Sequence, residues 1–250
     1  MSIIKSKYVN IDDIKFSNPK SYSKGKGSAV SILLNNRGIN MQTPRLLSLF
    51  GVNIYKDESE NIKSINLVLQ FNTTVDKPNR VNNFLNKIKK LDKNVSHKAN
   101  LEHKSWLHES KKLNNDYIDA LQKKSLYYSH LQNMEINHSK PPTFKVKIPY
   151  YNNEIQNLVL LDKNNNKISY TLEELEKKLK GDIIVKCIIN PSIYIVNQNF
   201  GITYNLKALK IIDKKTPVKK TKTVKSTKPT NTINNYFNDA NKLSNSSDES

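Results

Sequence analysis

The sequence holds one cysteine, few arginines and no long apolar run. Its single thiol, Cys187, cannot form an internal disulfide bond or a cluster of cysteine ligands for structural zinc. No stretch approaches the roughly 18 to 20 apolar residues of a membrane-spanning helix, and residues 1–10 lack the apolar stretch of a secretion signal. These absences predict an intracellular protein of a reducing compartment, the cytosol or the nucleus, with no membrane partner.

Catalytic and metal-binding patterns are missing as well. The five histidines include no pair at the i, i+4 spacing that would place two metal ligands on one face of a helix. They are His97, His103, His108, His130 and His138. The sequence also has no glycine-rich phosphate loop, no nucleophile elbow and no paired carboxylate motif. We therefore expect a protein that is not an enzyme and that needs neither a metal ion nor another cofactor.

Acidic residues are scarce relative to basic ones. The 250 residues contain 41 Lys and Arg against 22 Asp and Glu, which gives a formal net charge of +19. A positive field of this size favours a polyanionic partner, most often nucleic acid. However, 38 of the cations are Lys and the chain also has 35 Asn, an enrichment that AT-rich coding DNA produces too. Charge alone leaves both explanations open.

Composition divides the chain into three parts. Residues 1–27 mix Lys, Ser, Gly and Pro and are expected to form a basic, flexible arm. Residues 28–212 carry regular apolar patterns and form the folded domain, with a helical insertion at about 77–138. Residues 213–250 have almost nothing to bury and are expected to be a disordered tail, basic at first and acidic at its end.

Alternating apolar and polar residues predict strands on both sides of the insertion. They fall at 30–41 around a hairpin turn at Asn35-Asn36-Arg37-Gly38, and at 46–50, 64–71, 144–148, 158–161, 168–170, 183–189, 193–196 and 200–212. Pro191 is expected to turn the chain between 189 and 193. Strands with one buried and one wetted face are typical of a barrel or a sandwich.

Helical periodicity occupies the middle of the chain. A long amphipathic helix is predicted from Pro78 to Trp106, and a second helical stretch over residues 115–128. A separate short helix is predicted between Thr171 and Gly181, because Thr171 and Glu174 have the spacing of a capping box and glycine ends many helices. This short helix is expected to plug one end of a barrel.

Aromatic residues distinguish a generic basic protein from one that binds unpaired bases, which stack on aromatic faces with about 1–3 kcal/mol per base. Tyr194 faces outward if its two isoleucine neighbours belong to the core, which makes it a candidate for stacking. Tyr55, before an acidic loop, is either a stacking residue or part of the core. Phe200 and Tyr204 share one strand face, and they either contact nucleic acid or belong to the core.

Three basic residues are candidates for phosphate contacts. Lys145 and Lys147 are two residues apart in a predicted strand and share its solvent face, where they meet successive phosphates or are simply solvated. Arg45 is one of three arginines in a lysine-rich chain, which indicates a need for the planar guanidinium group, toward a phosphate or toward a carboxylate.

The tail contains one sharper pattern. In Thr230-Asn231-Thr232-Ile233-Asn234-Asn235-Tyr236-Phe237, an aliphatic residue is followed after two spacers by two adjacent aromatic residues. The pattern resembles the peptide by which replication proteins bind a sliding clamp, with Ile233, Tyr236 and Phe237 as the partner-binding residues, although the usual first-position Gln is Thr230 here. Chance, or docking to another partner, also accounts for two aromatic residues in such a segment.

Motifs spread between about residue 24 and residue 212 resemble the single-stranded DNA-binding proteins of large nucleocytoplasmic DNA viruses, an OB-fold family similar to certain phage single-strand binders. The residues that carry the resemblance are Gln42-Thr43-Pro44-Arg45 with Phe50-Gly51, Lys104-Ser105-Trp106, Pro142-Thr143-Phe144-Lys145-Val146-Lys147-Ile148-Pro149, Ser192-Ile193-Tyr194 with Phe200-Gly201, and Tyr204. The family's pattern favours Trp near positions 194 and 204, where this chain has Tyr. The resemblance implies a mainly β fold with an α insertion, namely an OB-type Greek-key barrel with a helical insertion and a short capping helix.

The resemblance also implies a function and its partners. We expect sequence-tolerant binding of single-stranded DNA during viral DNA replication, recombination or repair, at the host-cell site of viral replication, with no catalysis. The tail would recruit a sliding clamp, DNA polymerase or other replication proteins, and assembly into a homo-oligomer is left open. The alternative is a structural or virion protein that condenses duplex DNA through its lysines.

Overall fold

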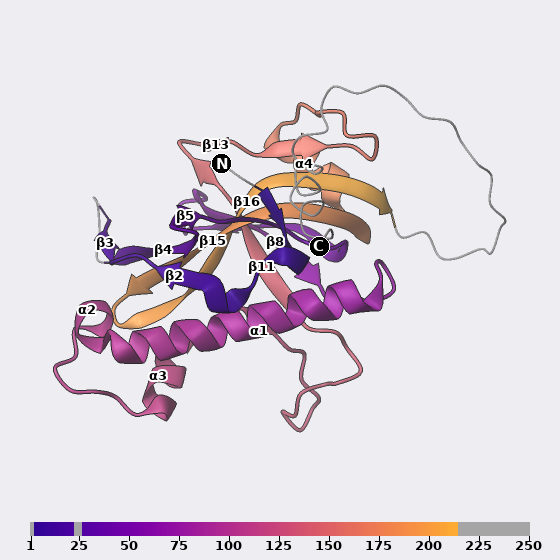
Figure 1. Ribbon diagram of the computed structural model, residues 1–250. Coiled ribbons are helices and arrows are strands. Elements are labelled where there is room, and N and C mark those ends of the chain that lie inside the picture. Colours follow the sequence, from indigo (N-terminus) through magenta and orange to yellow (C-terminus); the bar gives the residue numbers. More distant parts are fainter. Residues whose placement is uncertain (1–2, 23–26, 215–250) are drawn as a thin grey trace, which may run out of the picture.

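The computed structural model describes residues 3–22 and 27–214 (Figure 1). Strand pairing defines a barrel of five strands at its centre. The strands are β7 (Leu46–Lys56), β8 (Ile62–Gln70), β11 (Thr143–Ile148), β15 (Ile183–Val196) and β16 (Asn199–Lys214). β7 pairs with β8, β8 with β11, β15 with β16 and β15 with β7, all antiparallel. β11 meets β16 in parallel through the pair Lys147–Asn205, which closes the ring. A partly open five-stranded Greek-key barrel with this pairing is an OB-type fold, so the predicted fold class is confirmed.

The core follows the predicted alternation of the strands. Ile65, Leu67 and Leu69 of β8 are fully buried, as are Phe144, Val146 and Ile148 of β11. Their neighbours point outward, because successive side chains of a strand point to opposite faces. The same strands therefore supply both the apolar interior and a polar outer face.

Helix α4 (Leu172–Leu179) forms as its capping box predicts, and its Leu175 and Leu179 are buried in the core. Thr171 Oγ1 accepts a hydrogen bond from the Glu174 amide at 3.2 Å, and the Glu174 carboxylate accepts one from the Thr171 amide at 2.9 Å. At Gly51, in the bulge of β7, an added Cβ would lie 2.7 Å from the carbonyl oxygen of Leu179. The bulge thus lets the backbone of α4 pack directly against β7.

The helical insertion comprises α1 (Pro78–Leu101), α2 (His103–Leu107) and α3 (Asn115–Leu121), and α1 lies along the side of the strands opposite α4 (Figure 1). One stripe of α1, from Val81 to Ala99, is buried, as the periodicity predicts. The single helix expected to reach Trp106 is interrupted at Glu102, whose φ of −102° and ψ of 27° are not helical.

The helix predicted over 115–128 is wrong beyond Leu121. β9 (Gln122–Lys123) pairs in parallel with β16, and β10 (Leu126–Tyr127) pairs with β11. Pairing with the barrel outweighs the helical spacing of the local sequence. It provides hydrogen-bond partners for backbone groups of the segment, and it also buries Gln122 and Leu126. The end of the insertion is therefore extended chain that lies on the barrel.

The N-terminal residues differ from the expected flexible arm. β1 (Ile3–Lys5) pairs with β6 (Asn40–Gln42), while β2 (Ile14–Phe16) and β3 (Lys20–Ser21) pair with β4 (Ser28–Leu34). Two short 3₁₀ turns, Ser6–Tyr8 and Ile11–Asp13, lie between β1 and β2, and Val9 and Ile11 are in the core. Lys87 of α1 donates hydrogen bonds to three carbonyl oxygens of this segment, those of Ser6, Lys7 and Val9. Residues 3–22 are therefore part of the folded body, and 23–26 lie outside the described residues.

Two turn predictions have opposite outcomes. The hairpin between β4 and β5 (Arg37–Gly38) is confirmed, because Asn35 and Asn36 both adopt positive φ, 51° and 60°, as in the tight turns that join twisted strands. The turn at Pro191 is wrong, since β15 runs through it. Pro191 stands where the edge of β15 changes partner from β6 to β4, a place where a residue without an N–H is tolerated.

The remaining strands are short. They are β12 (Tyr150–Tyr151), β13 (Glu154–Ile155) and β14 (Val159–Leu161), of which β14 pairs in parallel with β16. The strand predicted at 168–170 does not form, and only Lys167 bridges to Leu161 there. Within residues 3–22 and 27–214, no helix has both the length and the apolar character that crossing a membrane requires.

Candidate nucleic-acid interface

The outer face of the barrel carries a row of polar residues, one from each barrel strand. Strand register pairs Asn53 with Asn66, Asn66 with Lys147, Lys147 with Asn205, and Asn205 with Asn190. Residues directly opposite each other on neighbouring strands share a face. Four amides and one ammonium group therefore cross all five strands at one level. The row is not apparent in the sequence, because its members are far apart in the chain.

Lys145 stands beside two exposed tyrosines. Its Nζ lies 4.7 Å from the ring centroid of Tyr127 and 6.0 Å from that of Tyr55, and each tyrosine residue is 47% exposed. An ammonium group over an aromatic face is attracted by the ring's quadrupole. This contact orients the lysine and leaves much of both rings accessible to solvent.

A hollow of about 170 Å³, which we name the barrel groove, adjoins these residues. It is lined by Lys123, Lys124, Lys145 and Lys147, by Tyr127 and Tyr194, and by Asn66, Ser125, Ile202, Thr203 and Tyr204. Four of these residues are cationic and none is acidic. The barrel groove is thus a positively charged concavity with aromatic walls.

Tyr194 lies against β16, where its backbone pairs with Gly201. A Cβ added to Gly201 would lie 2.8 Å from the Tyr194 hydroxyl and 2.8 Å from the Lys123 carbonyl oxygen. The ring occupies that space and is half-buried. Burial, with a smaller contribution from Tyr127, raises the pKa of Tyr194, so its hydroxyl stays protonated and can donate a hydrogen bond.

Phe200 and Tyr204 are corrections to the predicted set. Phe200 is fully buried and Tyr204 is 2% exposed, and the Tyr204 ring packs edge-to-face on Phe144 with centroids 5.6 Å apart. Neither ring has a face free for a base, because both fill the interior of the barrel. Tyr204 is among the residues that line the barrel groove, but almost none of its surface is exposed.

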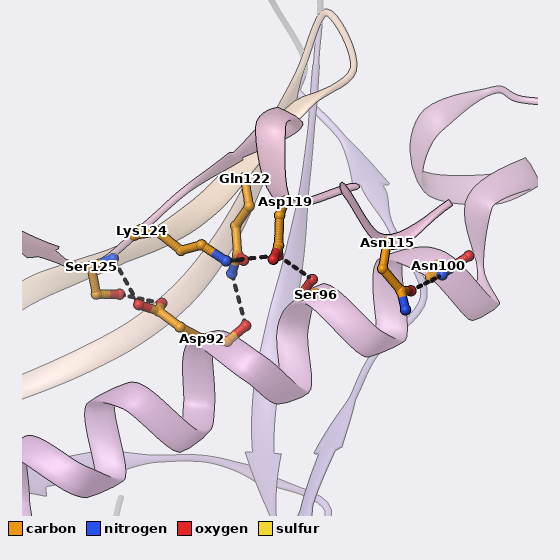
Figure 2. A network of polar contacts seen from close by, with 8 residues as sticks. All are labelled: Asp92, Ser96, Asn100, Asn115, Asp119, Gln122, Lys124 and Ser125. Carbon is orange, nitrogen blue, oxygen red and sulfur yellow. Dashed lines mark hydrogen bonds and ion pairs between the residues drawn. The ribbon is translucent and has the colours of Figure 1, made fainter. Parts of the chain in front are cut away.

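A buried carboxylate connects the helical insertion to the barrel groove. Asp92 of α1 is 6% exposed and accepts hydrogen bonds from the Ser125 amide at 2.8 Å and the Ser125 hydroxyl at 2.6 Å (Figure 2). Ser125 Oγ is in turn 3.0 Å from the Tyr204 hydroxyl, which donates because the single serine proton is directed at Asp92. Burial raises the pKa of Asp92 and places that of Tyr204 well above its ordinary value.

The same network fixes the extended segment after α3. Gln122 donates to the Asp92 carbonyl oxygen at 2.8 Å, and the Lys124 ammonium contacts Gln122 at 2.5 Å and Asp119 at 2.8 Å (Figure 2). These contacts hold residues 122–128 against the barrel. Lys123, Lys124 and Tyr127 line the barrel groove for that reason. This placement is not apparent from the sequence, because the segment has helical spacing.

Arg45 is not part of this surface. It precedes β7, so the strand separates it from Tyr55 by ten residues, on the order of 30 Å. Its backbone amide donates to Asp76 at 2.9 Å. Burial lowers the pKa values of the nearby Lys186 and Lys210, and the charge of Arg45 contributes to both shifts. Arg45 thus belongs to a separate cationic cluster around Asp76.

Two other predictions concern the tail and metal binding. Ile233, Tyr236 and Phe237 lie outside the described residues. Within the described part of the chain, no three His, Cys, Asp or Glu side chains come together in a group that could hold a metal ion.

The barrel and its groove define a class of structure: an OB-type barrel with a cationic, aromatic outer face and a helical insertion. No protein-family model and no curated protein sequence matches this chain. Among solved structures, it is similar to the single-stranded DNA-binding protein of bacteriophage Enc34 in complex with single-stranded DNA. The TM-score is 0.42 and the identity 10%, over 80% of this chain and 97% of that chain. It is also similar to gp2.5, a single-stranded DNA-binding protein encoded by bacteriophage T7, with a TM-score of 0.39 and 12% identity over 71% of this chain and 93% of that chain. Identities this low assign no role to any residue here.

Proposed function

We propose that this protein binds single-stranded DNA, without catalysis, in DNA replication, recombination or repair. The observation that carries the proposal is the position of the Lys145 ammonium over the exposed ring of Tyr127, at the edge of a groove with three further lysines. Proteins hold a single strand by a positive groove that follows the phosphates and by aromatic faces on which bases stack. Both components lie on one face of this barrel.

The place of the groove on the barrel supports the same proposal. β8 and β11 are the second and third barrel strands, and OB folds bind oligonucleotides on the face of these two strands. Because one fold hosts many functions, the residues on this face carry the support. Those residues are Asn66, Lys145 and Lys147, all on the outer face.

Each group then has a role in the proposed complex. Lys123, Lys145 and Lys147 neutralise phosphates. Tyr55, Tyr127 and Tyr194 offer ring faces to unpaired bases, and the amides of the polar row donate and accept hydrogen bonds with sugars, phosphates or base edges. A duplex keeps its base faces stacked inside, so the tyrosines favour a single strand. Since every base has a π-face, the binding tolerates any sequence.

We also propose that the tail recruits a sliding clamp, through Ile233, Tyr236 and Phe237, and so brings DNA polymerase or other replication proteins to the strand. The sequence pattern described above is the support for this part. The viral setting rests on the family resemblance of the motifs.

Competition between single and double strands tests the main proposal. A labelled single-stranded oligonucleotide bound to the full chain is displaced with unlabelled single strand or with duplex of the same sequence. We expect the single strand to compete better, and the logarithm of the binding constant to fall with the logarithm of salt concentration by about 0.7 for each phosphate neutralised. Equal or better competition by duplex would contradict the proposal and favour the DNA-condensing alternative.

A matched pair of variants locates the site. Lys145→Gln with Lys147→Gln removes two charges from the groove, whereas Lys163→Gln with Lys167→Gln removes two exposed charges in and beside the turn after β14. We expect the first pair to weaken single-strand binding and reduce the salt slope by about 1.4, at about 0.7 per phosphate contact. The second pair should leave the affinity and the salt slope near the wild-type values. If the two pairs weaken binding equally, the lysines act by general charge attraction and not through a groove.

A further inference from the structure

A second and larger hollow lies between α1 and the segment after α3. It has a volume of about 600 Å³, and we name it the helix hollow. The residues that matter for its chemistry are Lys89, Lys93 and His97 of α1, and Lys124, Leu126 and Tyr128 of the segment. Its size is that of a small-ligand site, and its walls combine an aromatic ring, an apolar side chain and convergent polar groups.

The α1 wall carries a regular stripe of two lysines and a histidine. Lys89, Lys93 and His97 follow one another at intervals of four residues, so they share a face of the helix and rise by about 6 Å per step. On the other faces, Lys90 pairs with Asp12 at 2.6 Å and Lys98 with Glu102 at 2.9 Å. Within residues 3–22 and 27–214, neither Lys89 nor Lys93 has an ion-pair partner. The stripe therefore presents charge that the fold itself does not use.

The helix hollow and the barrel groove share a wall. In the extended segment 122–128, Lys123, Ser125 and Tyr127 line the groove, whereas Leu126 and Tyr128 line the hollow. Lys124 lines both. This alternation follows from the two faces of an extended chain. Lys124 thus stands in the wall that the two concavities share.

The acidic residues of the helix hollow are already engaged. Asp92 accepts two hydrogen bonds from Ser125, and Asp119 accepts one each from Lys124 and Ser96 (Figure 2). Asp119 is thus paired with the Lys124 ammonium, and Asp92 is buried against Ser125. Lys89 and Lys93 remain to meet an anion that enters from outside.

We infer that a DNA strand bound in the barrel groove continues past Lys124 into the helix hollow, which holds a further nucleotide. Lys89 and Lys93 bind the phosphates on either side of that nucleotide. Its base packs against Tyr128 and Leu126, near the polar side chains of Ser96 and Asn115, which also line the hollow. The helical insertion is then a second binding surface that lengthens the site. This inference rests on the proposed function.

The experiment measures binding against oligonucleotide length. The full chain, a Lys89→Gln/Lys93→Gln variant and a Lys177→Gln/Lys178→Gln control are titrated with labelled single strands stepped from about 4 to about 16 nucleotides, the range of single OB folds. Both pairs remove two exposed helical lysines, and the control pair lies on α4 at the end of the barrel. Thermal unfolding of each variant checks that it is folded.

We expect the α1 variant to bind the shortest strands like wild type and the longest strands several-fold more weakly, with a salt slope reduced by about 1.4, at about 0.7 per phosphate contact. The α4 control should match wild type at every length. In a parallel measurement, long strands should protect Lys89 and Lys93 of the wild-type chain from acetylation, and short strands should not.

Two failures are distinguishable. If the wild-type chain shows no preference for single strands, the proposed function fails and the inference falls with it. If wild type prefers single strands and the Lys145→Gln/Lys147→Gln variant is weakened, but the α1 variant matches wild type at all lengths, the groove stands and the extension into the helix hollow is wrong. Protection of Lys89 and Lys93 by the shortest strands would also overturn the order of occupation.

Discussion

Asp92 and Ser125 are 33 residues apart in the chain, and the carboxylate of the first accepts hydrogen bonds from both the amide and the hydroxyl of the second, at 2.8 and 2.6 Å. The pair joins the middle of α1 to the strip of chain that carries Lys123, Lys124 and Tyr127. Since Ser125 also lines the barrel groove, the helical insertion and the candidate interface share one buried anchor. Asp92 and Ser125 are positioning residues for the groove.

The anchor gives a first prediction. Asp92→Asn replaces one acceptor oxygen with an NH₂ group that faces the donors of Ser125. Leaving a buried donor unpaired costs about 1–3 kcal/mol, so the free energy of unfolding, measured in urea, should fall by that amount. Asp119→Asn, at an exposed site, is the control and should have a smaller effect. An unchanged urea midpoint for Asp92→Asn would contradict the anchor.

The pH dependence of this difference has a definite sign. Burial raises the pKa of Asp92 above its ordinary 3.8, so the folded chain binds that proton more tightly than the unfolded chain does. Stability conferred by such a group is complete at low pH and falls as the pH rises from 3.8 through the raised pKa. The advantage of wild type over Asp92→Asn should therefore shrink with rising pH above 3.8. An advantage that grows over that window would show that the pKa of Asp92 is lowered in the folded chain and not raised by burial.

The exposed tyrosines give a second prediction. Tyr127→Ala and Tyr194→Ala should each weaken binding of a single strand by about 1–3 kcal/mol, the range for loss of one base–aromatic stack. Tyr127→Phe keeps the ring and should retain most of the affinity. Tyr151 is 66% exposed on β12, outside the groove, so Tyr151→Ala serves as the control. Fluorescence anisotropy at fixed salt measures all four, and equal losses at 127 and 151 would refute the stacking role.

Tyr204 gives a third prediction with the opposite signature. Tyr204→Phe removes the hydroxyl that bonds Ser125 and should lower the free energy of unfolding by about 0.5–1.5 kcal/mol, as for one ordinary hydrogen bond. Because the ring is buried, the folded variant should bind single strands like wild type. Calorimetry measures the stability and fluorescence anisotropy measures the affinity of the same preparation, so the two effects are separated. A large loss of affinity in a fully folded variant would restore Tyr204 as a contact residue.

The tail gives a fourth prediction. A peptide of residues 225–241 should bind the cognate sliding clamp, and its Tyr236→Ala/Phe237→Ala form should not, because the paired aromatic residues fill the hydrophobic pocket in the proposed complex. Isothermal titration with both peptides measures this. Equal binding of the two peptides would remove the aromatic pair from the contact.

The local sequence was sufficient wherever the stabilising partners are close in the chain. The outward Lys145 and Lys147 of β11 and the buried stripe of α1 follow from periodicity, since an element that packs on one side must repeat its apolar residues with its own pitch. The capping box of Thr171 and Glu174 follows from hydrogen bonds that span three residues. The order of strands and insertion in the OB-type barrel was implied by the resemblance of short motifs.

Tertiary structure decided the rest, for one physical reason. Residues 122–128 have helical spacing, yet they are extended because Gln122 and Ser125 find buried partners on Asp92 and because β10 pairs with β11. Phe200 and Tyr204 carry the same chemistry as an exposed stacking pair, and closure of the barrel around them made them core. The sequence by itself determined a basic, mainly β protein with outward lysines. Pairing between strands that are far apart in the chain brought Tyr127 to Lys145 and formed the groove. Local periodicity does not predict such pairing, because the stabilising energy comes from distant residues.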